Sequence, residues 1–327
     1  MSNLEIDPSV QVCEKSPLRH EPADVLVLQP REVPLGGPRA MTVRRTLPHR
    51  DRSFVGAWCF VDHYGPDEVA ASGGMDVPPH PHTGLQTVSW LFTGEIEHRD
   101  TAGNHAIVRP GELNLMTAGH GIAHTEVSTA DTSTLHGVQL WVVLPERDAH
   151  CARAFEHFIP EPVTAGSATV RVFLGSFAGA DSLVATSTPL LGAEVLLPAN
   201  TTWQVPVDDS FEHAVLVDEG VVRFCGQVAG RGALAIREPG ATSLTIESGP
   251  EDVRLVLLGG EPFPDEVIMW WNFIGRSTEE IRAQRAEWMA HSDRFGAVAG
   301  YEPASPGGAS WLPAPDLPEI TLRPRRR

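Results

Sequence analysis

The sequence predicts an all-β protein made of two similar units in tandem, followed by one short helix. Its 327 residues include 30 glycines and 28 prolines, so turns are frequent, and frequent turns favour short strands over long helices. In the first half, short apolar runs alternate with turn signals such as Gly94 and Pro110-Gly111. The same outline returns in the second half, with Gly220 lying 126 residues after Gly94 and Pro239 lying 129 residues after Pro110. This repeat indicates two copies of one β unit, packed as barrels or sandwiches.

The elements are expected in a simple order along the chain. Residues 1–22 are polar and mixed, which is typical of a flexible arm, and the apolar run 25–28 predicts a first short strand. The first unit is predicted to span residues 23–148 and to contain the metal-binding motifs described below. A polar stretch at about 146–168 is interpreted as a connector, and the second unit is predicted at 165–265.

The remaining segment, 266–327, is predicted to be a helix followed by an extended tail. Ser277 is followed three residues later by Glu280, and this pair forms a capping box ahead of apolar residues at helical spacing. The pattern predicts a helix over 278–291. Six prolines after residue 301 predict that the tail is extended and irregular.

The charge balance of the chain bears on its partners. The sequence has 42 acidic and 25 basic residues, which gives a formal net charge of −17. A surface this acidic repels phosphate backbones, so direct nucleic-acid binding is excluded as a function class. The same charge is compatible with a protein partner.

The cysteines and the apolar runs bear on the compartment. The four cysteines are scattered and form no Cys-x-x-Cys pair, which fits a reducing compartment better than a disulfide framework (Cys13, Cys59, Cys151 and Cys225). The first 30 residues lack the apolar core of a secretory signal, and no apolar run approaches the ~18–20 residues that cross a bilayer. A cytoplasmic protein without a membrane partner is predicted.

Two short motifs predict a metal site in the first unit. His80-Pro-His82 and His124-Thr-Glu126 each place two metal-binding side chains two residues apart. In an extended strand, residues i and i+2 point to the same face, so two such strands facing each other bring all four groups to one point. Three neutral imidazoles and a carboxylate suit Fe, Mn, Ni, Cu or Zn. Six-coordination would leave two positions for water, substrate or dioxygen.

The repeat predicts that the second unit lacks this site. The offsets of 126 and 129 residues map the first motif onto about 206–211 and the second onto about 250–255. Neither segment contains a histidine. One metal ion per chain is therefore expected.

For other polar residues, the sequence gives less support for a place in the metal site. Gln86 follows His82 by four residues, and its amide could hydrogen-bond a metal ligand and orient it. An ordinary residue on the polar face of a strand explains Gln86 equally well. His120 lies in the turn Gly119-His-Gly121 and could do the same, although a solvent-facing turn histidine explains it better. His63 could approach the mouth of the pocket, and both His98 and His105 are expected to be exposed beside a hairpin tip.

These motifs together resemble the pirin family of the cupin superfamily. The resemblance is carried by four segments, Gly74-(x)5-His80-Pro-His82-Thr-Gly84, Pro110-Gly-Glu-Leu-Asn114, Met116-Thr-Ala-Gly-His-Gly-Ile-Ala-His124-Thr-Glu126 and Gly137-Val-Gln-Leu-Trp-Val-Val-Leu-Pro145. It implies a bicupin whose first barrel holds a metal, commonly iron, through His80, His82, His124 and Glu126. One departure is Gln86, where pirins often carry glutamate. This difference bears on metal tuning and on the choice of substrate.

The resemblance implies two functions of different classes. Several pirins are similar to quercetin 2,3-dioxygenase, which opens a flavonol ring with dioxygen and releases carbon monoxide. The leading hypothesis is a metal-dependent dioxygenase with a small aromatic substrate, in which Glu126 also serves as the catalytic base. Iron is favoured, with Mn, Ni, Co, Cu or Zn as alternatives. The second hypothesis is a redox-sensing regulator that binds a protein partner and catalyses nothing.

Overall fold

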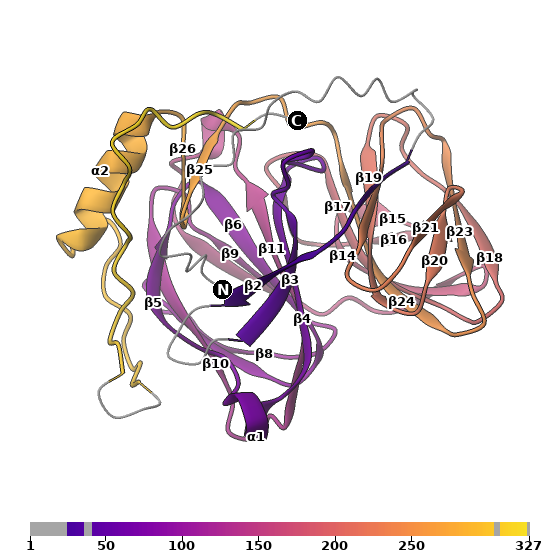
Figure 1. Cartoon of the computed structure of the whole chain (residues 1–327), viewed down its shortest axis with the longest axis horizontal. Helices are drawn as coiled ribbons and strands as arrows, with labels where there is room; N and C mark the ends of the chain where they lie inside the picture. The colour runs from indigo at the N-terminus through magenta and orange to yellow at the C-terminus, as the bar shows by residue number, and fades with distance from the viewer. Residues whose placement is uncertain (1–24, 36–40, 304–307, 326–327) are drawn as a thin grey trace.

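The computed structural model describes residues 25–35, 41–303 and 308–325, and within them the chain forms two β-barrels and a C-terminal helix (Figure 1). The predicted all-β class, with two tandem barrels and a short C-terminal helix, is therefore confirmed. The predicted flexible arm 1–22 lies outside the described residues. No described helix has the length and apolar character that a membrane crossing needs.

The first barrel consists of a seven-stranded and a four-stranded sheet. The larger sheet contains, in spatial order, β12 (Ala154–Phe158), β9 (Leu113–Thr117), β6 (Leu85–Thr93), β11 (Thr134–Val143), β4 (Trp58–Glu68), β3 (Met41–Leu47) and β2 (Arg31–Leu35). The smaller sheet contains β5 (Asp76–His82), β10 (Ile122–Ser128), β7 (Ile96–Asp100) and β8 (His105–Val108). One helical turn, α1 (Val69–Ser72), links β4 to β5. The metal motifs therefore lie on neighbouring strands of the smaller sheet.

The second barrel repeats this plan. Its larger sheet contains β1 (Val25–Leu28), β22 (Leu234–Arg237), β19 (Glu212–Glu219), β24 (Val253–Gly260), β17 (Leu190–Leu197), β14 (Ala168–Leu174) and β13 (Val163–Ala165). Its smaller sheet contains β18 (Thr202–Pro206), β23 (Ser243–Ser248), β20 (Val222–Phe224) and β21 (Gln227–Ala229). A two-stranded ribbon consists of β15 (Ser176–Phe177) and β16 (Ala180–Asp181). The equal strand numbers and orders bear out the repeat seen in the sequence.

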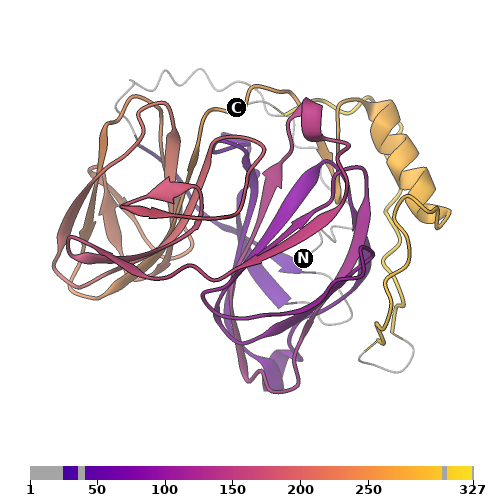
Figure 2. The same cartoon turned by 180° about the vertical axis from the view of Figure 1, so that it is seen from behind.

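The barrels lie side by side and pack through their larger sheets (Figures 1 and 2). One continuous apolar core includes Trp58 and Leu140 of the first barrel together with Leu216 and Val256 of the second. The Trp58 indole donates to the carbonyl of Leu191 across this interface (3.0 Å). Alternate residues of each larger sheet thus face the neighbouring barrel, while the others fill the sheet's own barrel.

Two strands belong to a different barrel than the predicted boundaries indicate. The strand predicted at 25–28 is present as β1, but it pairs with β22 and so belongs to the second barrel. The predicted connector contains β12, which pairs with β9 and belongs to the first barrel. The predicted limits at 23 and 148 therefore differ from the sheets, because composition reveals a strand but not the sheet that provides its hydrogen bonds. A 3-10 turn, η1 (Glu146–Asp148), precedes β12.

The C-terminal segment packs against the first barrel, on the side away from the second (Figures 1 and 2). It begins with the hairpin of β25 (Ile268–Trp270) and β26 (Phe273–Gly275) and continues into α2 (Thr278–Met289). The predicted cap is confirmed, since the Ser277 hydroxyl accepts from the Glu280 backbone N–H (3.1 Å). The indole of Trp288 on α2 donates to the carbonyl of Leu312 (2.8 Å), which holds the extended tail against the helix.

Candidate metal centre

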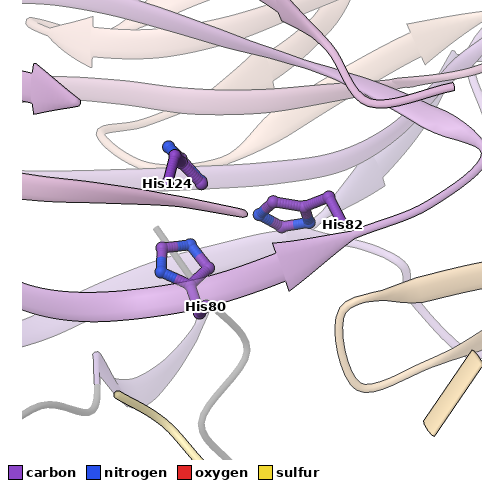
Figure 3. Close-up of side chains that lie close together, drawn as sticks. All are labelled: His80, His82 and His124. Atoms are coloured by element: carbon purple, nitrogen blue, oxygen red, sulfur yellow. The ribbon is translucent and has the colours of Figure 1, made fainter. Parts of the chain in front are cut away.

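Three buried histidines converge inside the first barrel (Figure 3). His80 and His82 lie on β5, and His124 lies directly opposite His80 on β10. Each side chain is 0% exposed, and one nitrogen of each lies within 4.8 Å of one nitrogen of the others. The ring centroids of His80 and His124 are 4.3 Å apart. The spacing argument placed these residues on facing strands, and the structure brings the imidazoles together.

The hydrogen bonds of these histidines leave their Nε2 atoms open. The Nδ1 atom of His80 lies 2.9 Å from the carbonyl of Pro78, which can only accept, so the proton of this ring is on Nδ1. The Nε2 atoms of His80, His82 and His124 are buried and have no hydrogen-bond partner among the described residues. Burial lowers the pKa of all three imidazoles well below the ordinary value, so they are neutral at pH 7. Three neutral rings with open nitrogens fit a divalent transition metal.

Glu126 lies beside this group. It is 1% exposed on β10, and a carboxylate oxygen lies within 4.8 Å of ring nitrogens of His124 and His98. The register between β10 and β5 shifts between His124 and Glu126, which indicates a β-bulge at this point. The Ser89 hydroxyl on β6 lies 3.2 Å from Oε1 of Glu126 and thus approaches the carboxylate from the other sheet. The predicted carboxylate is therefore adjacent to the histidines, and its role as a ligand stays a prediction.

His98 was expected to be exposed, and that expectation is wrong. Its side chain on β7 is 3% exposed, and its Nδ1 lies 3.4 Å from Nδ1 of His124. Its Nε2 lies 3.3 Å from Oδ2 of Asp100. A signal was available, because His98-x-Asp100 has the same i, i+2 spacing as the two metal motifs. His105, at the other side of the hairpin, is exposed and contacts Glu97, as expected for a surface residue.

The hydrogen bond of Gln86 and the ring contact of His120 go to residues other than the three histidines. Gln86 is buried on β6, and its side-chain amide donates to the Thr117 hydroxyl (2.9 Å), while its side-chain oxygen has no partner among the described residues. His120 is exposed in its turn, and its ring faces that of His150 at 6.0 Å. The exposure of His120 agrees with its interpretation as a solvent-facing turn residue.

His63 lies between the barrels rather than at a pocket mouth. It is 0% exposed, and its Nε2 and that of His136 each lie 2.6 Å from Oδ1 of Asp218 on β19. Arg44 donates to Nδ1 of His63 (3.2 Å), which requires the ring proton to be on Nε2. Arg254 donates to the other Asp218 oxygen (2.5 Å). A metal at this trio would have to displace the proton that Arg44 fixes, so the group is a hydrogen-bonded junction between the barrels.

The second barrel fills the equivalent positions with apolar side chains. By sheet order, β18 and β23 correspond to β5 and β10, so the segments 206–211 and 250–255 inferred from the offsets were wrong. The buried residues of β18 are Trp203 and Val205, and Trp203 pairs with Ile246 of β23 as His80 pairs with His124. The first offset failed because the loop between β18 and β19 is longer than the loop between β5 and β6. The second failed because Pro110-Gly111 precedes β9, whereas Pro239-Gly240 follows the equivalent strand β22. The ligand types of the first barrel are absent from these positions.

Comparison with known proteins places both barrels in one family. The family model described as Pirin matches residues 40–142, and the one described as Pirin C-terminal cupin domain matches residues 192–296. The first match contains all four predicted ligands. The second match begins within β17 of the second barrel and continues past the end of α2.

Individual relatives extend this likeness to nearly the whole chain. "Putative quercetin 2,3-dioxygenase PA1205" of Pseudomonas aeruginosa is 41% identical over 305 residues, which cover 92% of this chain and 95% of that protein. A "Pirin-like protein" of Caulobacter vibrioides is 34% identical over 275 residues, covering 81% and 93%. The crystal structure of quercetin 2,3-dioxygenase from Acinetobacter baumannii superposes with a TM-score of 0.85 at 34% identity, covering 92% and 97%. With both barrels matched in sequence and in structure, the chain belongs to the pirin family of two-barrel cupin proteins.

Proposed function

We propose that this pirin is a metal-dependent dioxygenase that acts on a flavonol-like or other enolisable aromatic compound. The observation that carries the proposal is the set of three buried imidazoles whose Nε2 atoms lack partners (His80, His82 and His124). A buried polar atom without a hydrogen bond costs about 1–3 kcal/mol, so three at one point are expected only where something binds them. The relatives named after quercetin 2,3-dioxygenase support this reaction class.

The proposed ligands are the three Nε2 atoms and the carboxylate of Glu126. The fixed tautomer of His80 turns its lone pair away from Pro78 and toward the group. Iron is the favoured ion, and Mn, Ni, Co, Cu or Zn would also accept these donors. When bound, the ion supplies Lewis-acid activation of the substrate oxygen and a site for dioxygen.

The surrounding side chains would orient the substrate and handle its proton. Glu126 is buried and approached by the Ser89 hydroxyl, so it is placed to accept the hydroxyl proton of an enolisable substrate. Trp141 packs against His82 in a T-shaped contact, with ring centroids 5.1 Å apart at 76°, and gives one side of the group an apolar surface. The flat apolar surface of Trp141 beside the histidines suits an aromatic substrate better than a phosphate or a sugar.

The test is reconstitution of the apoprotein with Fe, Mn, Ni, Co and Cu in turn, followed by assays of quercetin consumption and oxygen uptake. At least one metal should bind at one ion per chain and support turnover. The double variant His80→Ala/His124→Ala should lose both binding and turnover. His105→Ala is the matched control, because it removes an exposed histidine of the same barrel.

Two outcomes would contradict the dioxygenase proposal. If no metal supports turnover above that of the double variant, the proposal fails for flavonols. If the metal binds stoichiometrically and no substrate in a panel of enolisable aromatics is consumed, the regulatory hypothesis replaces it. In that case a protein partner should bind with an affinity that depends on the oxidation state of the iron.

A further inference from the structure

A chain of three side chains runs outward from the proposed metal site along β10 and β7. His124 is followed by His98 at 3.4 Å between their Nδ1 atoms, and His98 is followed by Asp100 at 3.3 Å between Nε2 and Oδ2. All three side chains are at most 4% exposed. We propose that His98 is a positioning residue that fixes the ring orientation and tautomer of His124 for metal binding. This inference rests on the proposed metal site.

One arrangement of protons satisfies every contact of this chain. For His124 to offer Nε2 to a metal, its proton must be on Nδ1, and that N–H must donate to Nδ1 of His98. The proton of His98 is then on Nε2 and donates to the carboxylate of Asp100. The carboxylate thus determines the tautomer of His98, and His98 determines that of His124. Outer carboxylate and imidazole partners of this kind tune metal ligands in other proteins.

The outer end of the chain is held rigidly. Oδ1 of Asp100 accepts from the backbone N–H groups of Ala102 (2.8 Å) and Asn104 (3.1 Å), so the hairpin turn fixes the carboxylate. The Asn104 amide also donates to both carboxylate oxygens (3.1 and 2.9 Å). On its face, the His98 ring stacks on Phe155 of β12, with centroids 4.8 Å apart. His98 is therefore held by Asp100 at its edge and by Phe155 at its face.

A different role for His98, as a ligand itself, is less well supported. His98, His124 and Glu126 offer atoms within 4.8 Å of one another, so an ion could be placed among them. An ion held through Nδ1 of His124, the nitrogen next to His98, would leave Nε2 of His124 without a partner. The open Nε2 atoms of His80 and His82 would then stay without a partner. Placing the ion at the Nε2 side gives the open Nε2 atom of each of the three histidines a partner and leaves His98 its two hydrogen bonds.

The experiment measures cobalt(II) binding to the full chain by competition with a chromophoric chelator. His98→Leu removes the acceptor and is expected to weaken cobalt affinity about 10- to 100-fold and to alter the visible d–d spectrum. His98→Asn places a carbonyl oxygen near the Nδ1 position and should recover most of the affinity. His98→Gln places its amide near the Nε2 position and should not. His105→Leu, a histidine on the neighbouring strand, should bind cobalt as the wild type does.

Several results would overturn the inference. Unchanged affinity and spectrum in His98→Leu would show that His124 needs no acceptor. If His98→Leu does not fold, equal cobalt affinities of His98→Asn and His98→Gln would also show that His124 needs no acceptor. A nitrogen count from X-ray absorption that falls by one in both His98→Leu and His98→Asn would make His98 a ligand. If the wild type binds no cobalt, the proposed metal site itself fails, which is a distinct result.

Discussion

At the scale of single residues, the site depends on where each proton is held. His80 is oriented by a backbone carbonyl of its own strand, whereas His124 depends on a side chain 26 residues away. Glu126 in turn contacts Ser89, whose hydroxyl comes from the opposite sheet and also lies 2.9 Å from the side-chain oxygen of Gln139. A hydroxyl has one proton, so Ser89 can donate to only one of these two oxygens at a time. The site therefore contains one shared donor next to its carboxylate.

Replacing Ser89 with alanine should lower turnover more than metal content. The change removes the hydroxyl beside Glu126 without touching a histidine, so the carboxylate loses orientation while the open nitrogens stay in place. We expect oxygen uptake per bound metal to fall on the order of 10-fold. The measurement is steady-state oxygen uptake normalised to metal content, with Ser89→Thr as the variant that keeps a hydroxyl. Equal rates in the alanine and threonine variants would show that the hydroxyl has no orienting role.

At the scale of elements, the strand with two of the histidines is supported from outside its sheet. β5 is an edge strand of the smaller sheet, which explains how it tolerates Pro81. Its other side is covered by the C-terminal segment, where the Leu312 N–H donates to the carbonyl of Pro79 (2.9 Å) and the Ile274 N–H donates to that of Thr83 (3.1 Å). The tail thus bonds to β5 itself, and the β25–β26 hairpin bonds to the residue directly after it.

Replacing Trp288 with alanine should loosen this support. The indole is 3% exposed and bonds to the Leu312 carbonyl, so its loss leaves a cavity and frees the tail from α2. We expect the free energy of unfolding to fall by about 3–5 kcal/mol and metal affinity to fall with it. Urea unfolding and cobalt titration measure the two effects. Met289→Ala, at the exposed end of the same helix, is the control and should cost less than about 0.5 kcal/mol.

At the scale of the whole molecule, buried polar contacts join the two barrels. Arg52 of the first barrel pairs with Glu212 of the second (2.5 Å), and Glu212, at 0% exposed, also accepts from the Gly56 N–H (2.6 Å). The His63–Asp218 contact forms a second buried junction. Together with the continuous apolar core, these contacts indicate that the barrels unfold as one unit.

Replacing Glu212 with alanine should destabilise both barrels. It leaves the buried Arg52 with a weaker partner and the Gly56 N–H without this acceptor, and breaking such a buried pair costs about 3–5 kcal/mol. We expect fluorescence and circular dichroism to report the same single urea transition, with its midpoint at a lower urea concentration than in the wild type. Glu247→Ala removes an exposed pair with Arg223 and should cost at most about 1 kcal/mol. Two separate transitions in the wild type would contradict the single unit.

Stability should also decrease in mild acid. Burial lowers the pKa of His63 and of His213 to about 4, whereas both titrate near 6.5 in the unfolded chain. Below about pH 6.5 the unfolded state therefore binds more protons. The free energy of unfolding should fall by up to about 1.4 kcal/mol per pH unit for each histidine until about pH 4.

Urea unfolding of the apoprotein at pH 7.5, 6, 5 and 4.5 measures this slope. His213→Gln should flatten it by about the contribution of one histidine, because the amide does not titrate. A wild-type free energy of unfolding that is constant across this range would contradict the presence of buried imidazoles that are neutral in the folded state.

Much of the local structure could be read from neighbouring residues. The strand at Val25–Leu28 and the cap of Ser277 on α2 were predicted because each depends on a few consecutive residues. The convergence of His80, His82 and His124 was predicted because two-residue spacing on facing strands leaves little choice of direction. Their assignment as ligands, with Glu126, stays a prediction.

The partners of those residues could not be predicted in the same way. His98 contacts His124 over 26 positions, and His63 contacts Asp218 over 155 positions across two barrels. No periodicity or spacing encodes such pairs, because they depend on which strands become neighbours and on how the barrels dock. The chain order thus specified the ligand motifs and the strand types, since these follow from side-chain direction along a strand. Burial and the sheet order specified which histidines support the site and which join the barrels, since both depend on distances in space.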